Sequence, residues 1–119
     1  MPESNSRITV STEGDVTVVE LADRKILDEV SILHIGEQLN TLVADKLKPK
    51  LVVDFTNVAH LSSSALGMLI TLHKNIRERD GKLSLCNIQP QIYEIFAITR
   101  LNDIFKISES RAEALTEMG

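Results

Sequence analysis

Aromatic residues and excess positive charge are both scarce in this sequence. The chain of 119 residues has no tryptophan, one tyrosine and three phenylalanines. It carries 13 basic against 17 acidic residues, a formal net charge of −4. A nucleic-acid-binding surface usually combines clustered basic residues with aromatic rings on which bases stack. We therefore expect no nucleic-acid partner.

Long hydrophobic runs and paired cysteines are also missing. No apolar stretch approaches the ~18 residues that a membrane span needs. The first residues, Met1 to Ser6, are polar and lack the basic-then-apolar order of a signal peptide. The one cysteine, Cys86, cannot form an internal disulfide and suits a reducing compartment. We therefore expect a cytoplasmic protein without membrane contact.

The motifs of common enzymes do not occur. The five glycines are too far apart for a dinucleotide fingerprint or a phosphate-binding loop, and no two of them flank a serine as in a nucleophile elbow. The three histidines lack the spacing of metal ligands and have a single cysteine to join. The sequence therefore predicts no metal, no cofactor, no catalytic residue and no enzymatic activity.

The length and the composition, 43% apolar and 25% charged, suit one globular domain. We expect a flexible tail at 1–6 and a single domain at 7–119, which at this net charge suits a monomer or a weak dimer. Short β-branched runs alternate with segments of helical periodicity. They predict extended segments at 8–10, 16–21, 25–27, 51–55, 83–86 and 104–107 and helices at about 29–46, 63–79, 90–99 and from Ser110 onward. This alternation predicts an α/β fold with a mixed, mainly parallel sheet of four to five strands.

Three consecutive serines, Ser62 to Ser64, open the second predicted helix. At about 100° per residue, Ser62 falls over the apolar stripe and suits the N-cap, as Asp28 does for the first helix. Ser64 falls on the polar face, and Ser63 lies toward it. Two interpretations stay open. The serines merely cap the helix, or one of them accepts a phosphate, which the free amides and dipole of a helix N-terminus favour.

The segment around these serines resembles a known motif. It reads Asp54-Phe-Thr-Asn-Val, and then Leu61-Ser-Ser-Ser-Ala-Leu-Gly-Met68-Leu. This order is similar to that of the STAS domain, and in particular of bacterial anti-sigma factor antagonists, over about residues 7–108. The resemblance implies a binding protein. Such an antagonist, when unphosphorylated, binds an anti-sigma factor that is also a serine kinase and so frees a sigma factor, and a serine phosphatase reverses the phosphorylation.

The resemblance also implies roles for individual residues. By position, Ser64 is the phosphoacceptor, with Ser63 as the alternative. Asp28, Asp54, Ser62 and Ser63 match positions that support the phosphorylated serine. The implied partner-binding residues lie just before this helix and along its first turns: His60, Leu61, Ala65, Gly67, Met68 and Thr71.

Two positions depart from the family pattern. Ser62 stands where the family has an aspartate, and Ala65 where it has a glycine. The first change removes a negative charge beside the serines, and the second adds a methyl group. A STAS subunit of a larger signalling or transport assembly, without phosphorylation, is therefore a second interpretation. A third is a small hydrolase with Ser64 as nucleophile, for which the sequence offers no evident base.

Overall fold

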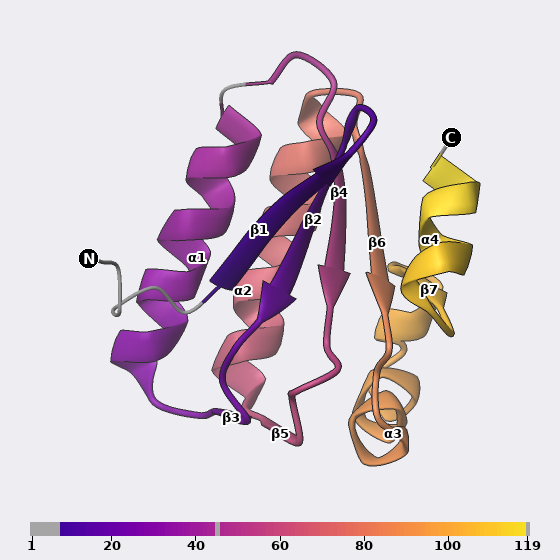
Figure 1. Cartoon of the computed structure of the whole chain (residues 1–119). Helices are drawn as coiled ribbons and strands as arrows, with labels where there is room; N and C mark the ends of the chain where they lie inside the picture. The colour runs from indigo at the N-terminus through magenta and orange to yellow at the C-terminus, as the bar shows by residue number, and fades with distance from the viewer. Residues whose placement is uncertain (1–7, 45, 119) are drawn as a thin grey trace.

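A five-stranded sheet forms the centre of the molecule (Figure 1). The structure, a computed structural model, describes residues 8–44 and 46–118, so the tail predicted at 1–6 lies outside the described residues. One pair of neighbouring strands is antiparallel and the other three pairs are parallel. This confirms the predicted α/β fold with a mixed, mainly parallel sheet. In spatial order the strands are β1 (Ile8–Glu13), β2 (Val16–Leu21), β4 (Lys50–Asp54), β6 (Lys82–Cys86) and β7 (Lys106–Ser108).

The antiparallel pair is a hairpin of β1 and β2, which contain the segments predicted to be extended at 8–10 and 16–21. Its register runs from Ile8 opposite Leu21 to Glu13 opposite Val16. The turn places Gly14 at a φ of 65°, a left-handed conformation that glycine adopts without a steric penalty. In the large sheet, β1 is therefore the strand that runs antiparallel to its neighbour, and the pairs that follow are parallel.

A second sheet, of two short parallel strands, connects the starts of two helices. It pairs β3 (Lys25–Ile26) with β5 (His60–Leu61). The sequence predicts an extended segment at β3 but does not predict β5. Helix α1 (Glu29–Ala44) follows β3, and helix α2 (Ser63–Glu78) follows β5. Both helices therefore start at the same end of the molecule and run side by side over one face of the large sheet (Figure 1).

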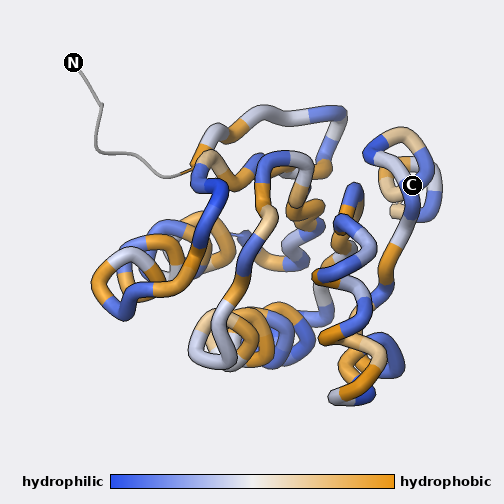
Figure 2. The backbone as a smooth tube through the Cα atoms, turned by 90° about the horizontal axis from the view of Figure 1, so that it is seen from below, coloured by the Kyte–Doolittle hydropathy of each residue, from blue (hydrophilic) through white to orange (hydrophobic). Residues whose placement is uncertain are grey.

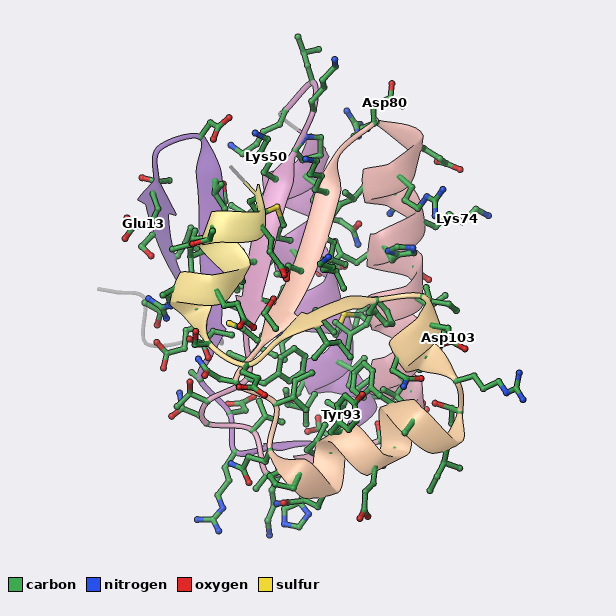
Figure 3. All side chains as sticks on the ribbon, turned by 90° about the vertical axis from the view of Figure 1, so that its right-hand side faces the viewer. Glu13, Lys50, Lys74, Asp80, Tyr93 and Asp103 are labelled. Carbon is green, nitrogen blue, oxygen red and sulfur yellow. The ribbon has the colours of Figure 1, made fainter. Side chains whose placement is uncertain are left out.

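The two faces of the large sheet are covered by different helices. Alternate strand residues, such as Leu51 and Val53, point toward α1 and α2 and join the main hydrophobic core. The residue between them, Val52, packs with α4 (Arg111–Met118) on the opposite face, where Figure 3 shows this helix lying across the strands. Figure 2 shows that polar and apolar positions mix within the helices, as expected where each helix buries one side.

Several boundaries differ from those predicted. The first helix ends at Ala44 rather than near 46, whereas α3 (Pro90–Ile98) and α2 end within one residue of the prediction. The last strand is displaced from 104–107 to Lys106–Ser108, because residues Leu101–Asp103 form a turn of 3-10 helix after Arg100 adopts a left-handed φ of 63°. Among the described residues, no helix is long and apolar enough to cross a membrane.

Candidate functional site

The three serines at the start of α2 have different environments. Ser62 has an extended backbone, with φ −88° and ψ 168°, and its side chain accepts a hydrogen bond from the Ala65 amide at 3.2 Å. This is the geometry of an N-cap, and it confirms the role that the helical spacing predicts for Ser62. Ser63 and Ser64 are exposed in the first turn of the helix. Ser64 makes no side-chain hydrogen bond with the described part of the chain, so its hydroxyl is accessible.

The exposed side of α2 continues the surface that begins at Ser64. Gly67 and Thr71 are exposed, and Met68 is half-buried. His60, at the start of the short strand before the helix, is exposed as well. These four residues lie where a partner can reach them, as the resemblance implies.

Two of the implied partner-binding residues lie below this surface. Ala65 is 0% exposed and Leu61 is 9% exposed. Ala65 falls on the inward stripe of α2, and Leu61 joins the hydrophobic core. The prediction that these two side chains contact a partner directly is therefore corrected. In the free protein both residues support the surface from beneath.

Asp28 lies at the same end of the molecule as the serines. Its carboxylate accepts the Ser31 amide at 2.9 Å and its carbonyl accepts the Ile32 amide at 3.1 Å, so Asp28 caps α1 as its position predicts. The Ser62 amide donates to the carbonyl of Ile26, two residues before Asp28, at 3.1 Å. The β3–β5 pairing thus brings the cap of α1 close to the cap of α2.

Close packing of α1 on α2 determines what lies beside Ser64. A Cβ atom built on Gly36 would lie 3.0 Å from Met68 Cγ, and Asn75 Nδ2 donates to Asn40 Oδ1 at 2.8 Å. The helices run in the same direction. One turn before Met68, Ser64 therefore lies level with residues 29–32 of α1.

An exposed apolar patch occupies this part of α1. Val30 is 65% exposed, Leu33 is 61% exposed, and Leu27, just before the helix, is 49% exposed. We call these three residues the α1 patch. The sequence analysis missed them because it counted only the inward stripe of this helix. The signal was available, since Val30 and Leu33 lie three residues apart, outside that stripe.

Asp54 is the centre of a hydrogen-bond network. It is 2% exposed. Its Oδ1 accepts hydrogen bonds from Thr56 N at 2.9 Å, from Thr56 Oγ1 and from Asn87 Nδ2 at 3.1 Å. Its Oδ2 accepts from Arg111 Nε at 3.2 Å and Nη2 at 2.8 Å, and Nη2 lies 3.4 Å from Glu20 Oε1. Burial alone raises the pKa of Asp54, but the hydrogen bonds from Thr56, Asn87 and Arg111 outweigh burial and hold this pKa below its usual value.

The structure does not place Asp54 with the serines. Side chains alternate along β4, so Val53 faces α1 and α2 while Asp54 faces α4. The prediction that Asp54 supports the phosphorylated serine is therefore corrected. Its carboxylate instead anchors Arg111, the first residue of α4. The sequence analysis missed Arg111 because 57 residues separate it from Asp54.

The described residues contain neither a cluster of metal ligands nor a reactive thiol. No cluster of histidine, cysteine, aspartate and glutamate side chains within them could hold a metal ion. Cys86 is buried, and burial together with the negative charge of Asp54 raises the pKa of its thiol to about 12. The thiolate, which is the reactive form, is therefore suppressed at neutral pH.

Comparison with curated proteins finds STAS-domain proteins and anti-sigma factor antagonists. A STAS-domain containing protein of Pseudomonas aeruginosa is 42% identical over 57 residues, which cover 48% of this chain and 56% of that protein. An anti-sigma-B factor antagonist of Listeria monocytogenes is 28% identical over 106 residues, covering 80% of this chain and 91% of that protein.

Solved structures give the same fold. An anti-sigma-factor antagonist (STAS) domain protein from Planctomyces limnophilus superposes with a TM-score of 0.83 at 23% identity, covering 93% of this chain and 97% of that one. The Bacillus cell fate determinant SpoIIAA, in its phosphorylated form, superposes with a TM-score of 0.70 at 16% identity, covering 94% and 99%. The model of the STAS domain matches residues 7–114. The chain belongs to the STAS domain family.

Proposed function

We propose that this protein is an anti-sigma factor antagonist that works by binding, not by catalysis. Unphosphorylated, it binds an anti-sigma factor with serine kinase activity and so releases a sigma factor. Phosphorylation of Ser64 by that partner ends the binding, and a serine phosphatase restores it. The observation that carries the proposal is the exposed Ser64 in the first turn of α2, together with the exposed α1 patch at the start of the helix packed against α2.

The apolar part of the surface supports a protein partner. Val30 and Leu33 are each more than 60% exposed, although apolar side chains gain free energy when they leave water. Exposed neighbouring apolar residues with polar residues around them are typical of protein interfaces. Here the polar neighbours are the exposed residues Ser64 and Thr71. We propose that the partner covers this patch and the serine together.

Phosphorylation would change the charge of this surface more than its shape. A phosphate on Ser64 adds about −1.5 to −2 charge at neutral pH. The first turn of a helix tolerates that charge, because its free amides and dipole are positive. Since the Ser64 side chain is exposed, we expect the fold to be kept. The bound state would be destabilised by the charge and by the cost of removing the phosphate from water.

The test uses the anti-sigma kinase of the bacterium that encodes this chain, purified and incubated with the chain and ATP. Mass spectrometry should locate one phosphate on Ser64. The variant Ser64→Ala should accept none, and the matched variant Ser63→Ala should be phosphorylated like the wild type. Phosphate on Ser63 in the wild type, or none at all, would refute the assignment of Ser64.

The interface has its own test. Leu33→Asp should weaken binding of the unphosphorylated chain to the kinase at least about tenfold, because it places a charge in an apolar contact. Leu47→Asp is the matched control, since Leu47 is 91% exposed and lies after α1, away from its start. Equal weakening by both variants would exclude the α1 patch as the interface.

A second candidate function is a STAS subunit of a larger assembly that is never phosphorylated. It is favoured by Ser62, which stands at the family's aspartate position and already uses its side chain to cap α2. In that case the purified kinase would leave both Ser63 and Ser64 unmodified and would not bind the chain. The phosphorylation and binding measurements above therefore separate the two candidates.

A further inference from the structure

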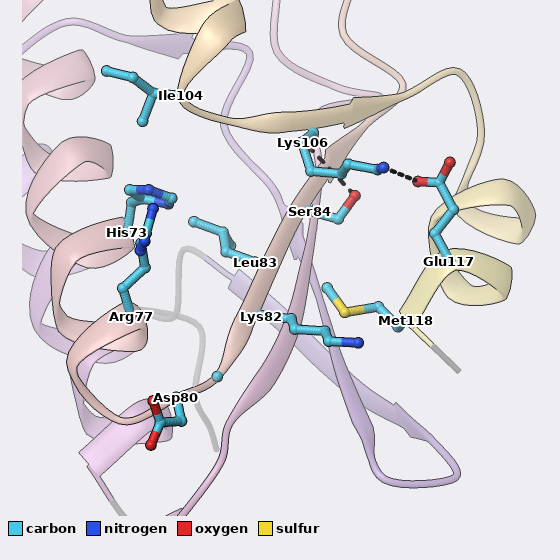
Figure 4. A pocket seen from close by; sticks show the side chains of 11 residues that line it. His73, Arg77, Asp80, Lys82, Leu83, Ser84, Ile104, Lys106, Glu117 and Met118 are labelled. Carbon is cyan, nitrogen blue, oxygen red and sulfur yellow. Dashed lines mark hydrogen bonds and ion pairs between the residues drawn. The ribbon is translucent and has the colours of Figure 1, made fainter.

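A hollow lies at the open edge of the large sheet, far from Ser64. Strand β7 pairs only with Ser84 to Cys86. Within the described part of the chain, no strand therefore lies on that edge beside the first residues of β6, Lys82 and Leu83. A cavity of about 550 Å³ opens there, between the second half of α2 and the end of α4 (Figure 4). Its α2 wall begins at His73, nine residues along the helix from Ser64, or roughly 14 Å.

The walls of this cavity carry more positive than negative charge. Arg77, Lys82 and Lys106 line it together with the two carboxylates of Asp80 and Glu117, which leaves one net positive charge. Lys106 lies 3.9 Å from Glu117, and this pair accounts for one charge of each sign. Neither Arg77 nor Lys82 forms an ion pair with any described residue. A guanidinium without a carboxylate partner suits an incoming anion.

Apolar side chains line one part of the cavity, around His73. Figure 4 shows Arg77 beside His73 on α2, with Leu83 facing the His73 ring and Ile104 on the side of that ring away from Arg77. Ile104 is 47% exposed, and its side chain could be covered further by a ligand. The His73 ring packs edge-on against Phe105, with 5.3 Å between ring centroids. An acidic group on Arg77 would therefore have an apolar surface beside it for a carbon chain.

His73 adds a polar group that lacks a partner. Its Nδ1 is buried and forms no hydrogen bond with the described residues, a state that costs free energy. Burial and the positive charge of Arg77 lower the pKa of His73, which favours the neutral ring. A ligand oxygen bound at Arg77 would lie next to this ring.

We propose that this cavity is a binding site for a small organic monoanion, a carboxylate on a short apolar chain, with the acid at Arg77 and the chain over Leu83 and Ile104. The single net positive charge of the walls matches one negative charge on the ligand. The size of the cavity lies within the range of small-molecule sites. This site is separate from the surface around Ser64, so it does not depend on the function proposed above.

The test is a titration of the ¹⁵N-labelled chain with hexanoate, followed by NMR. We expect saturable shifts at the amides of Leu83 and Ile104, with a dissociation constant in the millimolar range for so small a probe. Acetate, which lacks the chain, and hexanol, which lacks the charge, should each bind at least about fivefold more weakly. Hexanol binding as tightly as hexanoate would overturn the proposal.

Variants separate a specific site from general attraction. Arg77→Gln should weaken hexanoate about tenfold and leave the weaker binding of hexanol unchanged. Lys74→Gln is the matched control, because it removes the same charge from an exposed position of α2 outside the cavity. Equal weakening by Lys74→Gln, or no saturable shift at Leu83 and Ile104 in the wild type, would overturn the site.

Discussion

The ion pair of buried Asp54 with half-buried Arg111 leads to a prediction that relates stability to pH. The variant Arg111→Met keeps the length of the side chain but removes both donors to Asp54 Oδ2, at 2.8 and 3.2 Å. Hydrogen bonds to a charged group contribute about 1.5–3 kcal/mol. Water could reach Oδ2 after the change, because the Arg111 side chain is 36% exposed. Thr56 and Asn87 would still donate to Oδ1. We therefore expect a loss of about 2 kcal/mol in the free energy of unfolding at pH 7.

This loss should depend on pH in a defined direction. The pKa of Asp54 in the folded protein lies below its usual value, and an unperturbed aspartate titrates near pH 4. A lowered pKa stabilises the folded state above the unfolded pKa, and this contribution disappears as the pH falls through the folded pKa. The difference between wild type and Arg111→Met should thus be constant from pH 7 to about pH 5 and should shrink below about pH 4.

Urea unfolding followed by circular dichroism, at several pH values, measures this difference. The control is Arg24→Met, a change of the same kind at an exposed position, which should alter the free energy of unfolding by less than about 0.5 kcal/mol. A loss in Arg111→Met below about 0.5 kcal/mol would show that Asp54 does not anchor α4. A loss that stays constant down to pH 3 would refute the role of the Asp54 charge.

Three further predictions concern stability and reactivity. Gly81→Ala should destabilise the fold by about 1–3 kcal/mol, because the added Cβ would overlap the carbonyl oxygen of Pro49. Gly67→Ala should be neutral or stabilising, because its Cβ meets no other atom. Thermal unfolding of both variants checks this contrast, and equal losses of stability would contradict it. Ser62→Ala should cost about 1 kcal/mol through loss of the cap on α2, measured by urea unfolding, and an unchanged stability would contradict the capping role. Cys86, with its pKa raised to about 12, should react with a thiol reagent at pH 8 only after unfolding; rapid labelling of the folded protein would contradict its burial.

Local patterns predicted the helices and the serine cap. The N-cap role of Ser62 follows from its place on the wheel of α2, and a side-chain oxygen at that position bonds an amide three residues on. The cap of α1 by Asp28 follows in the same way. Both interactions join residues close in sequence, so the pattern of residue types contains them.

Contacts between distant segments were not predictable in this way. Strand β5 has two residues, and its pairing with β3 connects Lys25 to His60, a contact that no local pattern signals. The orientation of Asp54 toward Arg111 depends on which face of β4 receives α4. Similarly, helical periodicity predicts the inward residues of α1. It does not predict that exposed Leu33 lies on the helix that packs against α2, because that depends on the tertiary structure.

Binding of the anti-sigma kinase to the chain in its two phosphorylation states tests the central proposal most directly. Isothermal titration calorimetry would compare the unphosphorylated chain with the chain carrying phosphate on Ser64, after circular dichroism has shown the same fold in both. We predict that phosphorylation weakens binding at least about tenfold, which corresponds to about 1.4 kcal/mol. Equal affinity of the two forms for the kinase would contradict the proposal that Ser64 controls the partner interface.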